Sequence, residues 1–337
     1  RGLIGGALNS VVDWVDLCLV IDTGATDDAL AVARQVAGDK YREARVPWTD
    51  DFAAARNAAL AAATDLGADW TVVVDTDERL DRASVDIRQH LAETPHDVLM
   101  VFQRDGSYAK ERFFRLPTNA RYHGPTHEYV AADEASIGDL PGVRFREIRK
   151  CAGAYQAKFQ RDVEILTRYT AEHPDDPRWF YYLGDAHHGL GQEENAIAAF
   201  MACAALRGWN EESAWACYRA AECWLILDNP IQAIDCCAMG LTRHPGLAEL
   251  SWLAAYAAWR AGQFAHAAHW ARLSIAAGCF AGSGCNEPRR GFRNPRALYE
   301  GPYDVLRYAL RALGDEAGAE RAEQEYHAAA ALRVARS

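Results

Sequence analysis

Residues 70–78 read Trp-Thr-Val-Val-Val-Asp-Thr-Asp-Glu, an apolar run that ends in carboxylates. β-branched residues fill the centre of the run, which favours a buried strand. Two further apolar runs, 16–22 and 98–102, have the same character, and helical patterns cover 29–37 and 50–66. Alternation of apolar strands with helices predicts a Rossmann-like α/β domain with a mostly parallel sheet.

The second half of the chain has a different pattern, which is helical throughout from about residue 156. Small residues recur at Ala196, Ala233 and Ala267, as in the tetratricopeptide template of about 34 residues. These residues let paired helices approach closely, and stacked repeats fold as one unit. We therefore predict an α/β domain over 1–150 and an all-α tetratricopeptide-repeat solenoid over 151–337.

A basic loop interrupts the predicted repeats. Its arginines are Arg289, Arg290, Arg293 and Arg296. We expect a solvated loop, and the alternative is contact with a phosphate or an acidic acceptor.

Composition excludes several classes of protein. The 337 residues suit two domains, and 36 Lys+Arg against 47 Asp+Glu give a net charge of −11. Nucleic-acid binding needs a basic face, so we predict no nucleic-acid partner. The nine cysteines contain no CxxC pair, which favours a reducing, cytoplasmic compartment. No run of 18 apolar residues is present, so we predict no transmembrane segment.

The carboxylates that end the 70–78 run are the sharpest local signal. In an extended strand, Asp75 and Asp77 point to the same side. They lie at the carboxyl end of the strand, where open α/β sheets bind ligands. Two such carboxylates can hold Mg²⁺ or Mn²⁺ together with substrate phosphates. The alternative interpretation is a solvated acidic turn.

Polar residues also cluster at 20–27, 47–57 and 122–128. The first cluster holds Asp22 and Asp27 around a glycine, and its alternative role is plain helix capping. In the second, Arg56 can pair with a phosphate, or it can be an exposed helix arginine. The third contains His127 and Glu128, residue types that bind metal or move protons.

Taken together, the four clusters resemble family 2 glycosyltransferases. The resemblance is to the bacterial subgroup whose catalytic domain precedes tetratricopeptide repeats. That subgroup has Asp-Thr-Gly-Ser-Thr-Asp, then Trp-x-x-Asp-Phe-x-x-Ala-Arg-Asn, then Asp-x-Asp-Glu, then Gly-x-x-His-Glu. The matching segments are 22–27, 48–57, 75–78 and 124–128, with Ala25 in place of the serine. The resemblance covers most of the chain.

The resemblance implies a GT-A fold that binds a nucleotide-diphosphate sugar, with UDP the habitual nucleotide of the family. It implies that Asp22 and Asp27 lie by the nucleoside and Arg56 near the base or diphosphate. It also implies that Asp75 and Asp77 form the Asp-x-Asp pair. Of the two, Asp77 is favoured for direct contact with Mn²⁺ or Mg²⁺, and Asp75 for contact with ribose or sugar.

The implied reaction is an inverting displacement, in which a carboxylate takes the proton of the acceptor. Glu128 is the candidate for this base, because it follows a glycine-containing turn, and His127 is a candidate metal ligand. The repeats would hold a protein, peptide or glycan acceptor in their groove.

The beginning of the chain departs from the family pattern. The family starts with an apolar strand ending in Lys-Asn-Glu, before the helix that residues 2–14 represent. Loss of that strand predicts a fragment whose own activity is doubtful. One competing hypothesis is a non-catalytic tetratricopeptide adaptor with a relic nucleotide-sugar domain, and another is a nucleotidyltransferase on a related sheet. The retained polar clusters favour the transferase over the relic.

Overall fold

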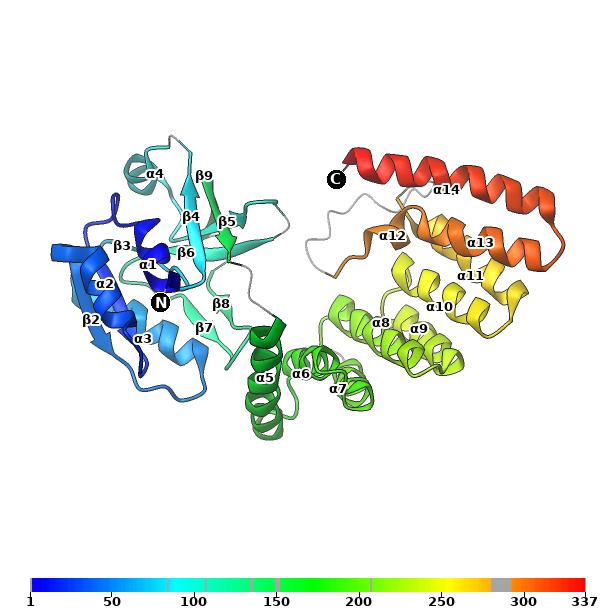
Figure 1. Cartoon of the computed structure of the whole chain (residues 1–337), viewed down its shortest axis with the longest axis horizontal. Coiled ribbons are helices and arrows are strands. Elements are labelled where there is room, and N and C mark those ends of the chain that lie inside the picture. Colours follow the sequence, from blue (N-terminus) through cyan, green and yellow to red (C-terminus); the bar gives the residue numbers. More distant parts are fainter. Residues whose placement is uncertain are drawn as a thin grey trace. The chain divides into compact units, whose positions relative to one another are not determined.

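The structure is a computed structural model that describes residues 2–83, 85–106, 108–133, 136–148, 152–206, 208–279 and 292–336. The chain forms two compact units, Arg1–Ala152 and Gly153–Ser337 (Figure 1). Strands and helices build the first unit, whereas the described part of the second unit is helical.

The first unit opens with a parallel pair of strands. β1 (Cys18–Asp22) pairs in parallel with β2 (Tyr41–Arg45). Helix α2 (Ala29–Ala37) lies between them in the chain and packs against both. A helical crossover is what a parallel pair requires. The strand and the helix predicted at 16–22 and 29–37 are therefore found, whereas β2 was not among the predicted strands.

A five-stranded sheet forms the centre of the first unit, in the order β3-β6-β5-β9-β4. Its strands are β3 (Trp70–Val72), β4 (Glu78–Arg82), β5 (Val98–Gln103), β6 (Ala109–Arg115) and β9 (Ile137–Glu147). Only the β5–β9 pair is parallel, and the other three pairs are antiparallel.

The prediction of a mostly parallel sheet is wrong for these five strands. Residues 104–108 join β5 directly to β6, and a link this short makes a hairpin, because a parallel pair needs a crossover of about a dozen residues. A continuous apolar strand indicates burial on both faces, and it does not distinguish parallel from antiparallel pairing. The sheet is mixed.

The remaining elements of the first unit position the polar clusters. They are α1 (Gly2–Asn9), the short 3₁₀ helix Gly38–Lys40, α3 (Phe52–Asp65), α4 (Ile87–Glu93), β7 (Arg121–His123) and β8 (Tyr129–Ala131). β7 and β8 form an antiparallel pair, and α3 packs against β1 and β7. The Asp51 side chain accepts a hydrogen bond from the Ala54 amide and caps α3. The cap places the start of α3 beside the strand pair.

The second unit consists of successive helix pairs. Its helices are α5 (Ala152–Glu172), α6 (Pro177–Gly189), α7 (Glu193–Leu206), α8 (Asn210–Ile226), α9 (Pro230–Arg243), α10 (Ala248–Arg260), α11 (Phe264–Ala277), α12 (Pro295–Leu298), α13 (Gly301–Ala312) and α14 (Glu316–Arg336). Neighbouring helices from α6 to α11 pack in sequence order, and α13 packs on α14 (Figure 1). Ala196, Ala233 and Ala267 are completely buried, as close helix packing requires. The predicted helical repeat region is confirmed.

None of the described helices combines the length and the apolar character that crossing a bilayer demands.

Candidate active site

A cluster of ion pairs lies where β3 ends. The strand stops at Val72 and residues 76–77 form a turn, so strand alternation does not set the directions of Asp75 and Asp77. Asp75 binds two arginines instead. Its Oδ1 lies 2.8 Å from Arg56 Nη2, and its Oδ2 lies 3.1 Å from Arg112 Nη2.

The two arginines decide the charge of Asp75. Burial acts to raise the pKa of this carboxyl, but Arg112 and Arg56 outweigh it and hold the pKa well below its usual range. The carboxylate is therefore ionised at neutral pH. The alternative of a solvated acidic turn does not describe Asp75.

Arg56 connects Asp75 to a second predicted residue. Its Nε donates to Glu128 Oε1 at 2.5 Å, and the guanidinium lies 5.5 Å from the centre of the Tyr122 ring. Only 18% of the Arg56 side chain is exposed, so the alternative of an exposed helix arginine is excluded. Three predicted site residues, Arg56, Asp75 and Glu128, thus lie in one cluster.

Hydrogen bonds to the backbone fix α3 against β7. The Asn57 side-chain amide donates to the Tyr122 carbonyl and accepts from the Tyr122 amide, both at 2.9 Å. The Phe52 amide donates to the Pro125 carbonyl at 2.8 Å. Because these bonds join α3 to the 122–128 segment, they set where Arg56 can meet Glu128.

Glu78 is a member of the cluster that the motif reading missed. It is 1% exposed, and its Oε1 binds Arg112 and, at 2.9 Å, Lys110 Nζ. Its Oε2 accepts from the Asp75 amide at 3.3 Å. Lys110 also lies 2.7 Å from Glu147. The available signal was Arg112 directly before the apolar pair Phe113 and Phe114 in a strand.

Asp22 and Asp27 bind nearby backbone. Asp22 ends β1, and its Oδ1 accepts from the amides of Ala25 and Gly24 at 2.8 and 2.9 Å. These two backbone bonds lower the Asp22 pKa. Asp27 Oδ1 accepts from the Ala29 amide at 3.0 Å at the start of α2. The N-cap position of α2 is Asp28, so Asp27 supports the helix start from one residue before the cap.

The predicted metal ligands do not form a ready-made cation site. Asp75 uses both oxygens on arginines, and His127 has a left-handed backbone, with φ of 50°. Among the described residues, one group of three metal-binding side chains lies close enough together to hold a metal ion. This group is in the second unit and contains none of Asp75, Asp77 or His127. A cation here would need oxygens from a diphosphate, and Mg²⁺ sites commonly combine one or two carboxylates with substrate phosphates.

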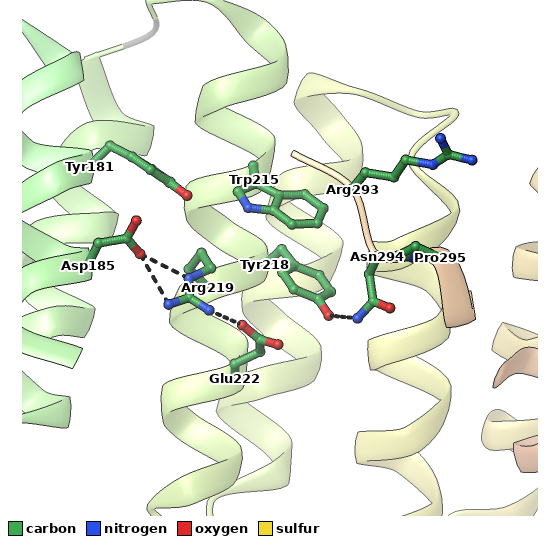
Figure 2. Close-up of a pocket in the computed structure, with 9 residues that line it drawn as sticks. All are labelled: Tyr181, Asp185, Trp215, Tyr218, Arg219, Glu222, Arg293, Asn294 and Pro295. Atoms are coloured by element: carbon green, nitrogen blue, oxygen red, sulfur yellow. Dashed lines mark hydrogen bonds and ion pairs between the residues drawn. The ribbon is translucent and has the colours of Figure 1, made fainter. Parts of the chain in front are cut away.

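A separate pocket of about 440 Å³ lies in the second unit (Figure 2). It is lined by Tyr181, Asp185, Trp215, Tyr218, Arg219, Glu222, Arg293, Asn294 and Pro295. Trp215 and Tyr218 stack with ring centres 4.5 Å apart, and Asn294 donates to the Tyr218 hydroxyl at 3.0 Å. Arg219 pairs with Asp185 and Glu222.

Arg293 brings the predicted basic loop to this pocket, while Arg289 and Arg290 lie outside the described residues.

Comparison with known proteins assigns the first unit. Residues 2–149 match the model of glycosyl transferase family 2. This segment is a family 2 glycosyltransferase domain. Members of the family generally use nucleotide-sugar donors and divalent metals. The chain thus combines a family 2 domain with a tetratricopeptide-like helical region, as its resemblance implied.

Two relatives resemble the chain in sequence. A TPR repeat-containing protein of Synechococcus elongatus is 38% identical over 216 residues, which cover 58% of this chain and 51% of the relative. The glycosyltransferase SunS of Bacillus subtilis, derived from prophage SPbeta, is 25% identical over 213 residues, covering 56% and 47%. The chain spans about half the length of these curated relatives.

Among solved structures, the crystal structure of MamA is similar with a TM-score of 0.42 and 15% identity, over 55% of this chain and 98% of MamA.

Proposed function

We propose that this protein transfers a sugar from a nucleotide-diphosphate donor, with UDP as the nucleotide, to a protein or glycan acceptor. The observation that carries the proposal is the partly buried contact of Arg56 with Asp75 and Glu128 inside a family 2 domain. These three residues come from three of the four motif segments. A partly buried group of opposite charges near the end of a strand is typical of a site that handles charged substrates.

The leaving group of the reaction sets what the site must do. When the glycosidic bond breaks, its electron pair goes to the nucleotide diphosphate, which gains negative charge. Arg56 and Arg112 are positioned to stabilise this charge. A bound Mg²⁺ or Mn²⁺ would supply further neutralisation. We propose Asp77 as its main protein ligand, with Asp75 and His127 as further ligands, and Asp22 and Asp27 as contacts of the nucleoside.

Glu128 is the proposed base of an inverting displacement. Arg56 holds its Oε1, and among the described residues no second hydrogen bond or ion pair engages Glu128. Its Oε2 can therefore accept the acceptor proton while the acceptor attacks the sugar carbon. Arg56 would act as a positioning residue for this carboxylate.

We further propose that the acceptor contacts the pocket of the second unit. The rings of Trp215 and Tyr218 are buried in the pocket wall, and the partly exposed ion pairs of Arg219 offer polar groups beside them (Figure 2). A few polar groups around an apolar surface are typical of ligand pockets. Replacement of Arg293, an exposed residue of the pocket lining, by alanine should then raise KM for the acceptor while donor hydrolysis is unchanged.

Donor binding tests the proposed function. The melting temperature of the chain should rise with UDP plus Mn²⁺, and Asp77→Asn should abolish the metal-dependent part of that rise. Asp81→Asn is the matched control, because Asp81 lies on β4 in an exposed pair with Arg146. A screen of nucleotide sugars for hydrolysis then identifies the donor. Absence of binding by any nucleotide diphosphate would favour the adaptor alternative.

A further inference from the structure

Three side chains of metal-binding type meet in the second unit. His188 lies near the end of α6, Glu193 begins α7, and Cys223 lies in α8. His188 Nδ1 is 2.8 Å from Glu193 Oε2 and 3.6 Å from Cys223 Sγ. The ligand atoms of all three residues lie within 4.8 Å of one another.

The burial of this cluster leaves the carboxylate of Glu193 with His188 as its basic partner. Glu193 is 8% exposed and Cys223 is 1% exposed, whereas His188 is half-buried. Within the described residues, the salt bridge of Glu193 is to His188, with no arginine or lysine. The buried acids of the first unit differ, because Arg112 pairs with both Asp75 and Glu78. A buried carboxylate is costly unless a cation or hydrogen bonds compensate it.

The spacing of the three ligand atoms suits a tetrahedral zinc ion. Zinc lies about 2.3 Å from cysteine sulfur and about 2.0 to 2.1 Å from histidine nitrogen, which places the two ligands roughly 3.5 to 3.6 Å apart at the tetrahedral angle. The observed Sγ–Nδ1 distance is 3.6 Å. The carboxylate oxygen would need to move only about half an ångström from the histidine to reach the matching separation.

We propose that His188, Glu193 and Cys223 bind one Zn²⁺ ion, with water as the fourth ligand. Thiolate, imidazole and carboxylate together suit this borderline-soft metal. Binding releases the proton of the Cys223 thiol to solvent. Because the ligands come from three consecutive helices, the ion would join one helix pair of the solenoid to the next and stabilise the second unit.

The neighbouring histidine provides a matched control. His187 also contacts the residue five positions later, with Nδ1 2.7 Å from Gln192 Oε1. Its partner is a neutral amide, and no cysteine completes that pair among the described residues. Cys237, which is buried in α9, is the matched control for the thiol.

Cobalt substitution tests the proposed zinc site. The metal-free full chain is titrated with Co²⁺ and then with Zn²⁺. We expect one equivalent of Co²⁺ to give tetrahedral visible bands and a thiolate-to-cobalt charge-transfer band, which Zn²⁺ removes. Cys223→Ser should lose the charge-transfer band, and His188→Gln and Glu193→Gln should weaken binding at least tenfold. His187→Gln and Cys237→Ser should bind as the parent does. A carboxylate site at Asp77 has no thiolate, so it cannot produce the charge-transfer band.

Three results would overturn the zinc site: no charge-transfer band in the parent chain, a band that survives Cys223→Ser, or equal losses in His187→Gln and His188→Gln. If Cys223→Ser does not fold, as judged by its far-UV circular dichroism, the half-exposed His188 decides the outcome. Unchanged cobalt affinity in a folded His188→Gln variant would then exclude this site.

Discussion

Arg56 Nη2 lies 2.8 Å from Asp75 Oδ1, although one residue is on α3 and the other is in the turn after β3. The same guanidinium binds Glu128 through Nε. One partly buried cation therefore joins two acids that are far apart in the sequence.

Removal of the Arg56 guanidinium should destabilise the first unit. Arg56→Met leaves Glu128 without its ion pair and Asp75 with Arg112 alone. Breaking a fully buried pair costs about 3 to 5 kcal/mol, and this partly buried group should cost at most about 3 kcal/mol. Urea unfolding of the parent and of the variant measures this loss in the free energy of unfolding. The relevant transition is the one that the substitution shifts. Arg146→Met, which removes an exposed pair with Asp81, should cost at most about 1 kcal/mol. Equal losses in the two variants would contradict a buried role for Arg56.

Lys110 offers an internal comparison, because it pairs with both Glu78 and Glu147. Glu78 is buried, whereas 46% of the Glu147 side chain is exposed. We expect Glu78→Gln to lower the free energy of unfolding by about 3 to 5 kcal/mol, because Arg112 loses its buried partner. Glu147→Gln should lower it by at most about 1 kcal/mol. Thermal unfolding of both variants tests this order, and the reverse order would show that burial does not set the strength of these pairs.

Acid should remove the stabilisation that Asp75 contributes. Its pKa is lowered in the folded protein, since Arg112 and Arg56 outweigh the effect of burial. The contribution is therefore complete above the ordinary carboxyl pKa of about 4 and is lost as the pH falls below it. The parent should be more stable than Asp75→Asn by a constant amount between about pH 7 and 5. That difference should shrink below about pH 4. The free energy of unfolding of the parent and of Asp75→Asn, measured across this pH range, tests the expectation. A difference that grows on acidification would refute it.

The solenoid depends on small residues where helices cross. A Cβ on Gly240 of α9 would lie 2.7 Å from Leu250 Cδ1 and 3.0 Å from Cys217 Cβ. Gly240→Ala should therefore destabilise the second unit by about 1 to 3 kcal/mol. Gly153 of α5 has no atom within 4 Å of such a Cβ, so Gly153→Ala should be neutral or stabilising by up to about 1 kcal/mol. Urea unfolding compares the two, and a stabilising Gly240→Ala would contradict the close packing.

The sequence predicted well those features that depend on local pattern. Helix α2 has the predicted bounds 29–37, because its periodicity, Asp28 before it and Gly38 after it lie within one short segment. The buried alanines of the repeats were also predictable, since a repeating template marks them. Strand direction in the central sheet was not predictable from apolar character, because β5 is buried whether its neighbours run parallel or antiparallel.

By itself, the sequence determined the segments that form β1, α2, α3, β3, β5 and β6, the repeat region and the four motif segments with their candidate residues. Only the tertiary structure decided that Arg56 meets Asp75 and Glu128, and that Glu78 is buried beneath them. The physical reason is that periodicity and capping act over a few residues, whereas the partner of a charged side chain depends on which distant segments the fold brings within a few ångströms.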